Sequence, residues 1–256
     1  MGLPEGLLID VDGVLVTSWR ALPGAADALT RLRGESVPFL LATNTTSLSR
    51  DSLAARLRDA GIHVEGDEVV TAPAVTASYL RAHFPGARCH LLGEPQLGTD
   101  FDGIELVDSG PDVVVVAGAD PAFTWENVST AFRMVRDGAE LVAMHRNLFW
   151  MTEAGLMLDA GAFLLGLERA TGKEARVIGK PSPEFFRECL GMLALPPGRV
   201  AMVGDDLEAD VLAAQDVGLR GILVRTGKFL PETLERSPRQ PDVVIDSIAN
   251  LPELLV

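Results

Sequence analysis

Short apolar runs recur along the chain, and most are apolar throughout instead of alternating with polar residues. Runs of this kind, rich in Val, Ile and Leu, are typical of parallel strands that are buried on both faces. They predict strands at Leu7–Asp10, Pro38–Thr43, Cys89–Gly93, Asp112–Gly118, Glu140–Met144, Arg176–Gly179, Arg199–Gly204, Gly221–Arg225 and Val243–Asp246.

The segments between these runs carry helix signals. Apolar residues at helical spacing follow Thr124, which we expect to cap the helix that they form. Ser182 and Pro183 are typical of the first positions of a helix. Gly218 is typical of the residue just after one, here a helix predicted over Leu207–Val217. Because strand and helix signals alternate, the predicted fold class is α/β with a doubly wound parallel sheet.

Composition narrows the possible functions. The chain has 256 residues, of which 47% are hydrophobic, so it is long enough for one large domain or two modest ones. Its 22 Lys and Arg residues against 36 Asp and Glu residues give a net charge of −14. Because that charge repels phosphate backbones and anionic lipid, we expect no nucleic-acid partner and no membrane partner. A pocket for a small anionic substrate is still compatible with it.

Other sequence features point to a cytoplasmic protein without zinc. We see no secretory signal and no apolar run long enough to cross a membrane. The two cysteines, Cys89 and Cys189, have no zinc-ligand spacing and form no CxxC pair, so we expect two buried free thiols. The four histidines also lack ligand spacing.

The most informative stretch is an apolar strand that ends in Asp-Val-Asp-Gly. Asp10 and Asp12 are two residues apart, so they project to the same side of the strand, at the end where open α/β sheets bind ligands. Two such carboxylates repel each other unless a cation lies between them or one is protonated. Oxygen ligands favour Mg²⁺, although Asp-x-Asp-Gly alone is also typical of an ordinary turn. A calcium loop is excluded, because its twelfth position is Ala21 instead of Glu.

Two further stretches have groups that can bind phosphate after a predicted strand. Thr43 and Asn44 follow the strand that begins at Pro38, and their polar groups can hydrogen-bond a phosphate. Taken alone, this pair is better interpreted as an ordinary helix cap. Lys180 follows another apolar run and precedes a helix start, where it can hold a phosphate or neutralise carboxylates. The alternative for Lys180 is a surface lysine in a turn.

A third group of acids follows the run that ends at Gly204. Asp205 is the natural third carboxylate for a metal ion. Asp206 and Asp210 could orient Lys180 or a water molecule at the metal. An acidic helix start is an equally good interpretation of these two residues.

In this order, Asp-x-Asp-Gly, Thr, Lys and Gly-Asp-Asp-x-x-x-Asp resemble the motifs of the haloacid dehalogenase (HAD) superfamily of phosphotransferases. The resemblance implies a Rossmann-like core. The long separation of Thr43 from Lys180 implies an inserted α/β cap domain of the type-IIA branch. We therefore expect the core at residues 1–74 and 178–256 and the cap at residues 75–177.

The resemblance also implies roles for the acids. Asp10 would attack phosphorus and form an aspartyl-phosphate, and Asp12 would protonate the leaving group and later activate water. Mg²⁺ would be bound by Asp10, by the backbone carbonyl of Asp12 and by Asp205. The ion would offset the repulsion between nucleophile and phosphate.

Thr43, Asn44 and Lys180 would hold the transferring phosphoryl group. The predicted function is therefore a Mg²⁺-dependent phosphatase that acts on a small phosphorylated metabolite. The sequence does not distinguish a phosphomonoester from a P–N bond or pyrophosphate as the target, because the chemical centre is shared. Two other classes compete with this prediction: a receiver-like signalling module that keeps an aspartyl-phosphate, and a catalytically quiet relative that binds proteins.

We expect the cap to determine substrate specificity. The candidates are His145, Arg146 and Asn147, which follow the predicted strand Glu140–Met144. A surface arginine is the competing interpretation of Arg146. By resemblance to type-IIA proteins, we also expect a homodimer that forms through the cap.

Overall fold

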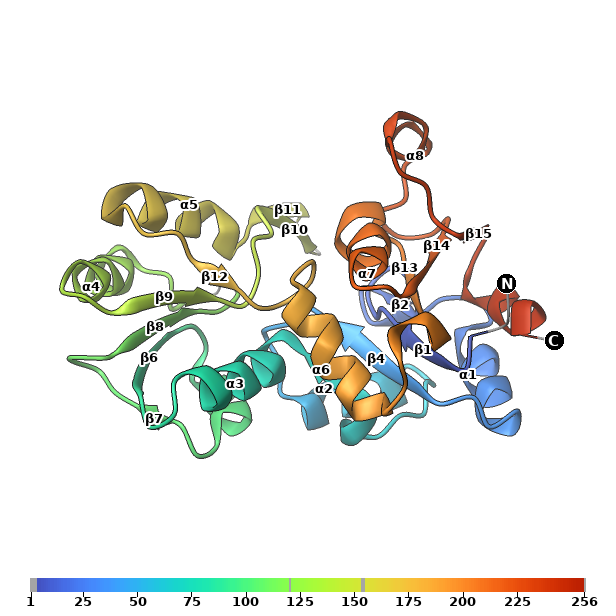
Figure 1. Cartoon of the computed structure of the whole chain (residues 1–256), viewed down its shortest axis with the longest axis horizontal. Helices are drawn as coiled ribbons and strands as arrows, with labels where there is room; N and C mark the ends of the chain where they lie inside the picture. The colour runs from blue at the N-terminus through green and yellow to red at the C-terminus, as the bar shows by residue number, and fades with distance from the viewer. Residues whose placement is uncertain (1–3, 120, 153–154, 256) are drawn as a thin grey trace. The chain divides into compact units, whose positions relative to one another are not determined.

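The computed structural model describes residues 4–119, 121–152 and 155–255 and contains two compact units (Figure 1). The second unit interrupts the first in the sequence, so the first unit is assembled from three separate stretches. The first unit comprises the chain up to Thr43, Arg50–Val70 and the chain from Lys180 onward, and the second comprises Asn44–Ser49 and Thr71–Gly179. The domain boundaries given above stay predictions.

The first unit is built around a six-stranded sheet. Its strands are β1 (Gly6–Ile9), β4 (Phe39–Thr43), β5 (Val69–Thr71), β13 (Val200–Gly204), β14 (Arg220–Val224) and β15 (Val243–Ile245). They lie in the order β15-β14-β13-β1-β4-β5, and β1 is parallel to both of its neighbours. The strands that follow β1 in the sequence, β4 and β5, lie on one side of it. The later strands β13, β14 and β15 lie on its other side, so the strand order reverses at β1.

The apolar runs form this sheet because it is covered on both faces. Every residue of β1, β4 and β13 is buried. The α-helices of the unit are α1 (Ala25–Gly34), α2 (Arg50–Asp59), α6 (Pro183–Leu193), α7 (Ala213–Asp216) and α8 (Pro231–Arg236). Short 3₁₀ segments lie at Gly66–Glu68, Pro197–Arg199 and Ile248–Leu255.

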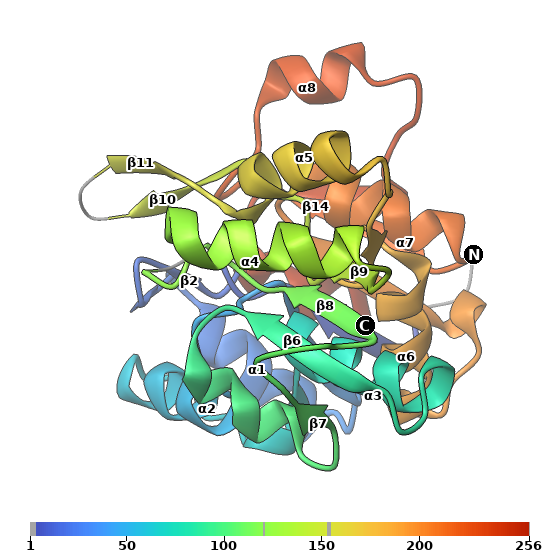
Figure 2. The same ribbon diagram turned by 90° about the vertical axis from the view of Figure 1, so that its left-hand side faces the viewer.

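The second unit has a smaller parallel sheet. Its strands are β6 (Arg88–Leu92), β7 (Glu105–Leu106), β8 (Val113–Val116), β9 (Glu140–Ala143) and β12 (Arg176–Val177), in the order β12-β9-β8-β6-β7. Figure 2 shows α4 (Trp125–Arg136) and α5 (Ala160–Thr171) along one face and α3 (Ala72–His83) on the other. A 3₁₀ segment spans Pro95–Phe101. The α/β class predicted from the sequence is confirmed in both units.

Several short strands were not predicted from the sequence. One hairpin pairs β2 (Val16–Thr17) with β3 (Arg20–Ala21), and another pairs β10 (Phe149–Thr152) with β11 (Gly155–Leu158). These strands have two to four residues. The strands β2 and β3 each contain one polar and one apolar residue, so no apolar run marks them in the sequence.

The predicted helix starts are confirmed, but one helix has an unexpected geometry. The side chains of Thr124 and Ser182 cap α4 and α6. The helix predicted over Leu207–Val217 instead begins as a π-helix, Leu207–Leu212, that continues into α7. Turns of this kind are rare and are often found at functional sites.

The structure also describes the two cysteines and the length of the helices. Cys89 and Cys189 are both buried and unpaired, as expected. None of the helices in the described part of the chain combines the length and the apolar character that crossing a bilayer requires.

The burial of β1 predicts a large effect of a mutation in this strand. Leu8 is completely buried, whereas Leu106 on β7 is 41% exposed. We expect Leu8→Ala to lower the free energy of unfolding by about 2–5 kcal/mol, because it removes buried methyl groups and leaves a cavity. Leu106→Ala is the control and should cost much less. Urea unfolding measures both, and equal losses would contradict the central position of β1.

Candidate active site

The carboxyl ends of β1 and β13 lie side by side where the strand order of the first unit reverses. Ile9 and Val203 are paired in register, so Asp10 and Asp205 leave adjacent strands at the same edge of the sheet. The Asp10 N–H donates to the carbonyl oxygen of Val203 at 2.9 Å. Asp10 is 7% exposed and Asp205 2%. Open α/β sheets bind their ligands at such a point.

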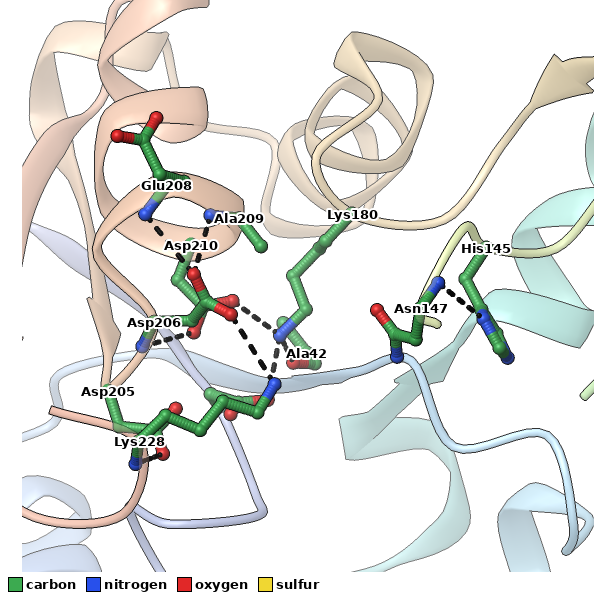
Figure 3. Close-up of polar contacts among 11 residues, drawn as sticks. Ala42, His145, Asn147, Lys180, Asp205, Asp206, Glu208, Ala209, Asp210 and Lys228 are labelled. Atoms are coloured by element: carbon green, nitrogen blue, oxygen red, sulfur yellow. Dashed lines mark hydrogen bonds and ion pairs between the residues drawn. The ribbon is translucent and has the colours of Figure 1, made fainter. Parts of the chain in front are cut away.

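Lys180 contacts two buried carboxylates and a backbone carbonyl (Figure 3). Its Nζ lies 2.7 Å from Oδ1 of Asp10 and 2.7 Å from Oδ1 of Asp210. It also donates to the carbonyl oxygen of Ala42 at 2.7 Å. The lysine side chain is 4% exposed. Its charge is therefore held in place and is little screened by water.

The two carboxylate oxygens of Asp205 differ in their contacts. Its Oδ2 accepts a hydrogen bond from the Lys228 N–H at 2.7 Å, whereas Oδ1 is buried with no hydrogen-bond partner among the described residues. Asp10, Asp205 and Asp210 each offer an oxygen, and these oxygens lie within 4.8 Å of one another. Leaving a buried carboxylate oxygen unsatisfied costs free energy, which a cation offsets. The donors fit a divalent cation that prefers oxygen ligands.

Burial and mutual repulsion raise the pKa values of these acids. Burial, followed by the charges of Asp10 and Asp210, raises the pKa of Asp205 to about 8. Burial also raises the pKa of Asp210 to about 7 and raises the pKa of Asp10, although the charge of Lys180 opposes both shifts. Burial would lower the pKa of Lys180, but the two carboxylates in contact with it raise this pKa, so the lysine stays charged.

The other predicted residues of the first unit differ in burial. Asp12 is exposed, and its charge helps to raise the pKa of Asp10. Thr43 is buried at the end of β4. Asp206 caps the π-helix, where its Oδ1 accepts hydrogen bonds from two backbone N–H groups at 3.2 and 3.0 Å. The structure thus brings Asp10, Lys180, Asp205 and Asp210 together, whereas Asp206 holds the start of the helix.

Comparison with known proteins places the chain in a family. The haloacid dehalogenase-like hydrolase family model matches residues 7–106, and the HAD-hydrolase-like model matches residues 177–251. Haloacid dehalogenase-like hydrolase domain-containing protein 2 from Homo sapiens is 38% identical over 243 residues, which cover 95% of this chain and 92% of that protein. The chain belongs to the haloacid dehalogenase-like hydrolases.

Two further proteins that resemble the chain are named as phosphatases, and a third similar structure is NagD. Phospholysine phosphohistidine inorganic pyrophosphate phosphatase from Rattus norvegicus is 34% identical over 258 residues, covering 98% of this chain and 94% of that protein. The solved 4-nitrophenylphosphatase from Thermotoga maritima has a TM-score of 0.93 at 32% identity, covering 99% of this chain and 98% of the other. NagD from E. coli K-12 has a TM-score of 0.89 at 29% identity, covering 97% and 98%. The chain is therefore a HAD phosphatase with an α/β, Rossmann-like core.

In this HAD phosphatase, the predicted specificity residues all lie in the second unit. His145 is buried, with its Nε2 3.8 Å from Oδ1 of Asp159, and the Asn147 N–H lies 3.3 Å from His145 Nδ1 (Figure 3). Arg146 forms two hydrogen bonds with Glu168, at 2.8 and 2.6 Å. The Arg146 guanidinium therefore stabilises its own unit, and the role of the three residues in specificity stays a prediction.

Thr43 and Asn44 are neighbours in sequence but belong to different units. In the second unit, Asn44 lies so close to Gly179 that a Cβ on this glycine would come within 2.7 Å of Asn44 Oδ1. The structure thus groups Asn44 with the residues of the second unit, and its binding of phosphate stays a prediction.

Thr226–Lys228 is a segment of this HAD phosphatase that contacts the site and was not predicted from the sequence. Besides the backbone contact with Asp205, Lys228 has its Nζ 3.4 Å from Oδ2 of Asp206. The Thr226 hydroxyl donates to the carbonyl oxygen of Gly13 at 2.5 Å. Its position after a strand could have indicated a role in the site. The segment follows the end of β14, just as the aspartates follow the ends of β1 and β13.

The raised pKa of Asp205 predicts how pH affects the metal-free protein. Because this pKa is about 8 in the folded chain against an ordinary value of 3.8, the folded state binds the proton more tightly than the unfolded state. The resulting stabilisation is complete below about pH 4 and is lost as the pH rises toward about 8. In EDTA, the melting temperature should therefore fall between these pH values.

Asp205→Asn removes the titrating group and should reduce this fall. Differential scanning fluorimetry across the pH range measures the slope for both proteins. The same slope in wild type and in Asp205→Asn would contradict the assignment of the raised pKa to Asp205.

Proposed function

We propose that this phosphatase depends on Mg²⁺ and hydrolyses a small phosphorylated metabolite through an aspartyl-phosphate on Asp10. The observation that carries the proposal is the contact between Asp10 and Lys180 beside Oδ1 of Asp205, which is buried without a hydrogen-bond partner among the described residues. Phosphoryl transfer needs a positioned nucleophile and strong electrostatic stabilisation, and these groups can supply both.

The acids of the site support Mg²⁺ as the cofactor. Asp10 and Asp205 would hold the ion together with the backbone carbonyl of Asp12. Asp210 lies near the same position, but its Oδ1 is already engaged by Lys180. When bound, the ion offsets the repulsion between the carboxylates and the phosphate group.

In the first step, a carboxylate oxygen of Asp10 attacks phosphorus, and the bond from phosphorus to the leaving atom breaks. Asp12, in its acid form, gives its proton to the leaving atom and becomes a carboxylate. The exposure of Asp12 supports this role, because a leaving group can reach it from solvent. The products of the step are the aspartyl-phosphate and the neutralised leaving group.

In the second step, the oxygen of a water molecule attacks the phosphorus of the aspartyl-phosphate. The carboxylate of Asp12 takes one proton from this water, and the bond between phosphorus and Asp10 breaks. Inorganic phosphate leaves, and both aspartates return to their initial states. Asp12 thus acts first as an acid and then as a base.

Thr43, Asn44 and Lys180 would hold the phosphoryl group during both steps. In support, Lys180 donates to the carbonyl oxygen of Ala42, the residue before Thr43, so the lysine and the threonine meet at the same strand end. The Lys180 ammonium would stabilise the charge that develops on the phosphoryl oxygens.

The substrate would be selected by the second unit, with His145, Arg146 and Asn147 as the candidates. The names of the relatives include a phospholysine, phosphohistidine and pyrophosphate phosphatase and a 4-nitrophenylphosphatase. Phosphomonoesters, P–N bonds and pyrophosphate are therefore all reasonable targets for the first tests.

A homodimer through the second unit is part of the same proposal. Apolar side chains are exposed on the hairpin of β10 and β11, where Phe149 is 60% exposed and Leu158 64% exposed. Apolar side chains gathered on one surface element favour burial against a second molecule.

The nucleophile is tested by the Asp10→Asn variant. Because an amide is a poor nucleophile, we expect release of phosphate to fall by at least about a thousandfold. The assay uses phosphomonoesters, phosphohistidine, phospholysine and pyrophosphate, with Mg²⁺ and with EDTA. Asp59→Asn, which changes an exposed acid at the end of α2, is the control. Turnover that persists in EDTA or in Asp10→Asn would contradict the proposal.

The intermediate is tested by the Asp12→Asn variant. With 4-nitrophenyl phosphate, whose leaving group needs no proton from Asp12, the first step should continue while loss of the base slows the second, so the phosphorylated enzyme should accumulate and be found after a rapid acid quench. Peptide mass spectrometry should locate the added phosphoryl group on Asp10. Wild-type protein that keeps this group for minutes would instead indicate a receiver-like module, and phosphorylation elsewhere would contradict the assigned nucleophile.

A further inference from the structure

The segment Thr226–Lys228 contacts both of the loops that carry the proposed metal ligands. It follows β14 and contacts Gly13, which comes directly after Asp12, and Asp205. These contacts take no part in the proposed transfer of the phosphoryl group, but they join the loop after β1 to the loop after β13.

We propose that Thr226–Lys228 is a positioning element that aims Oδ1 of Asp205 at the metal ion. The proposal rests on the metal dependence proposed above and adds how one ligand is oriented. Three independent contacts carry it: a backbone hydrogen bond, a close packing of glycines and a side-chain hydrogen bond.

The backbone hydrogen bond sets the rotation of the carboxylate. The Lys228 N–H donates to Oδ2 of Asp205 at 2.7 Å, which occupies one of the two oxygens. The other oxygen, Oδ1, is buried and has no hydrogen-bond partner in the described part of the chain. The carboxylate therefore presents a single oxygen, and its orientation is set before a ligand binds.

Two glycines, Gly13 and Gly227, pack closely against the same carboxylate. A Cβ at Gly13 or at Gly227 would each lie 1.9 Å from Oδ2 of Asp205, which no real structure tolerates. A Cβ at Gly227 would also lie 2.6 Å from the Gly13 Cα. Both glycines have positive φ angles, of 82° and 59°. The carboxylate thus occupies space that opens only because neither residue has a side chain.

The side-chain hydrogen bond joins the two loops. The Thr226 hydroxyl donates to the Gly13 carbonyl oxygen at 2.5 Å. Gly13 follows Asp12 directly in the chain. The bond to the Gly13 carbonyl therefore also restrains the backbone of Asp12, whose own carbonyl oxygen is a proposed metal ligand. The segment consequently restrains the Asp12 and Asp205 ligands relative to each other.

The chemistry explains why such restraint matters. Ligands that are already oriented lose less freedom when a metal binds, and groups that hydrogen-bond to ligands change metal affinity about 10- to 100-fold. Mg²⁺ demands near-ideal octahedral geometry, so it is sensitive to small errors in ligand position. A defect in the segment should therefore weaken Mg²⁺ binding.

The first test compares Thr226→Val with Thr226→Ser. Valine removes the hydroxyl at nearly constant shape, whereas serine keeps it. We expect Thr226→Val to raise the Kd for Mg²⁺ about tenfold and Thr226→Ser to stay near the wild-type Kd. Isothermal titration calorimetry on metal-free protein measures the Kd directly. The Mg²⁺ concentration for half-maximal turnover should rise by the same factor.

The second test compares two glycine substitutions with matched backbone strain. Gly227 and Gly110 have φ angles of 59° and 57°, but the nearest described atom to a Cβ at Gly110 would be in the Arg88 side chain, at 3.6 Å. Gly227→Ala should weaken Mg²⁺ binding about 10- to 100-fold, whereas Gly110→Ala should leave it unchanged. Melting temperatures in EDTA separate a loss of metal affinity from a loss of stability.

Each outcome decides the proposal. Weaker binding in Thr226→Val and Gly227→Ala, with wild-type binding in Thr226→Ser and Gly110→Ala, supports it. If Gly227→Ala does not fold, the threonine pair decides. Folded Thr226→Val protein that binds Mg²⁺ as tightly as wild type overturns the positioning role and leaves the proposed function intact. Wild-type protein that binds no Mg²⁺ overturns both.

Discussion

The burial of three carboxylates around Lys180 is the constraint on which the site depends. Asp10, Asp205 and Asp210 are each less than a tenth exposed, and Lys180 contacts two of them. Removing these charges from water is unfavourable unless they are paired. Raised pKa values for Asp205 and Asp210 are the expected response of the metal-free protein. A divalent cation bound among these carboxylates would stabilise their ionised forms and so lower their pKa values.

The sheet of the first unit is what brings these acids together. Strands distant in sequence, β1 and β13, are neighbours in register, so the residues that follow them share one edge. The residues of β1 and β13 are fully buried, which fixes their register through packing on both faces. The loops that follow these strands can therefore carry polar and charged residues, because the buried strands stabilise the fold.

Strand ends were the part of the site that sequence could predict. Apolar runs located β1, β4 and β13. The aspartates that follow β1 and β13 could be recognised from residue type and spacing alone. The hydrogen bond from the Lys228 N–H to Asp205 could not be predicted, because nearly every residue has a backbone N–H and residue type does not show which one donates. The packing of Gly13 against Gly227 depends on tertiary contact between distant loops. The strands β2 and β7 were missed because each consists of one polar and one apolar residue and therefore forms no apolar run.

The central claim is that the buried carboxylates around Lys180 form a site for one divalent cation. Calorimetric titration of the metal-free protein with Mg²⁺, compared with Asp205→Asn, tests this claim most directly. The account predicts a single binding site in the wild type that is lost or greatly weakened in Asp205→Asn, which keeps the shape of the side chain and removes its charge. Equal binding in both proteins, or no binding in the wild type, would contradict it.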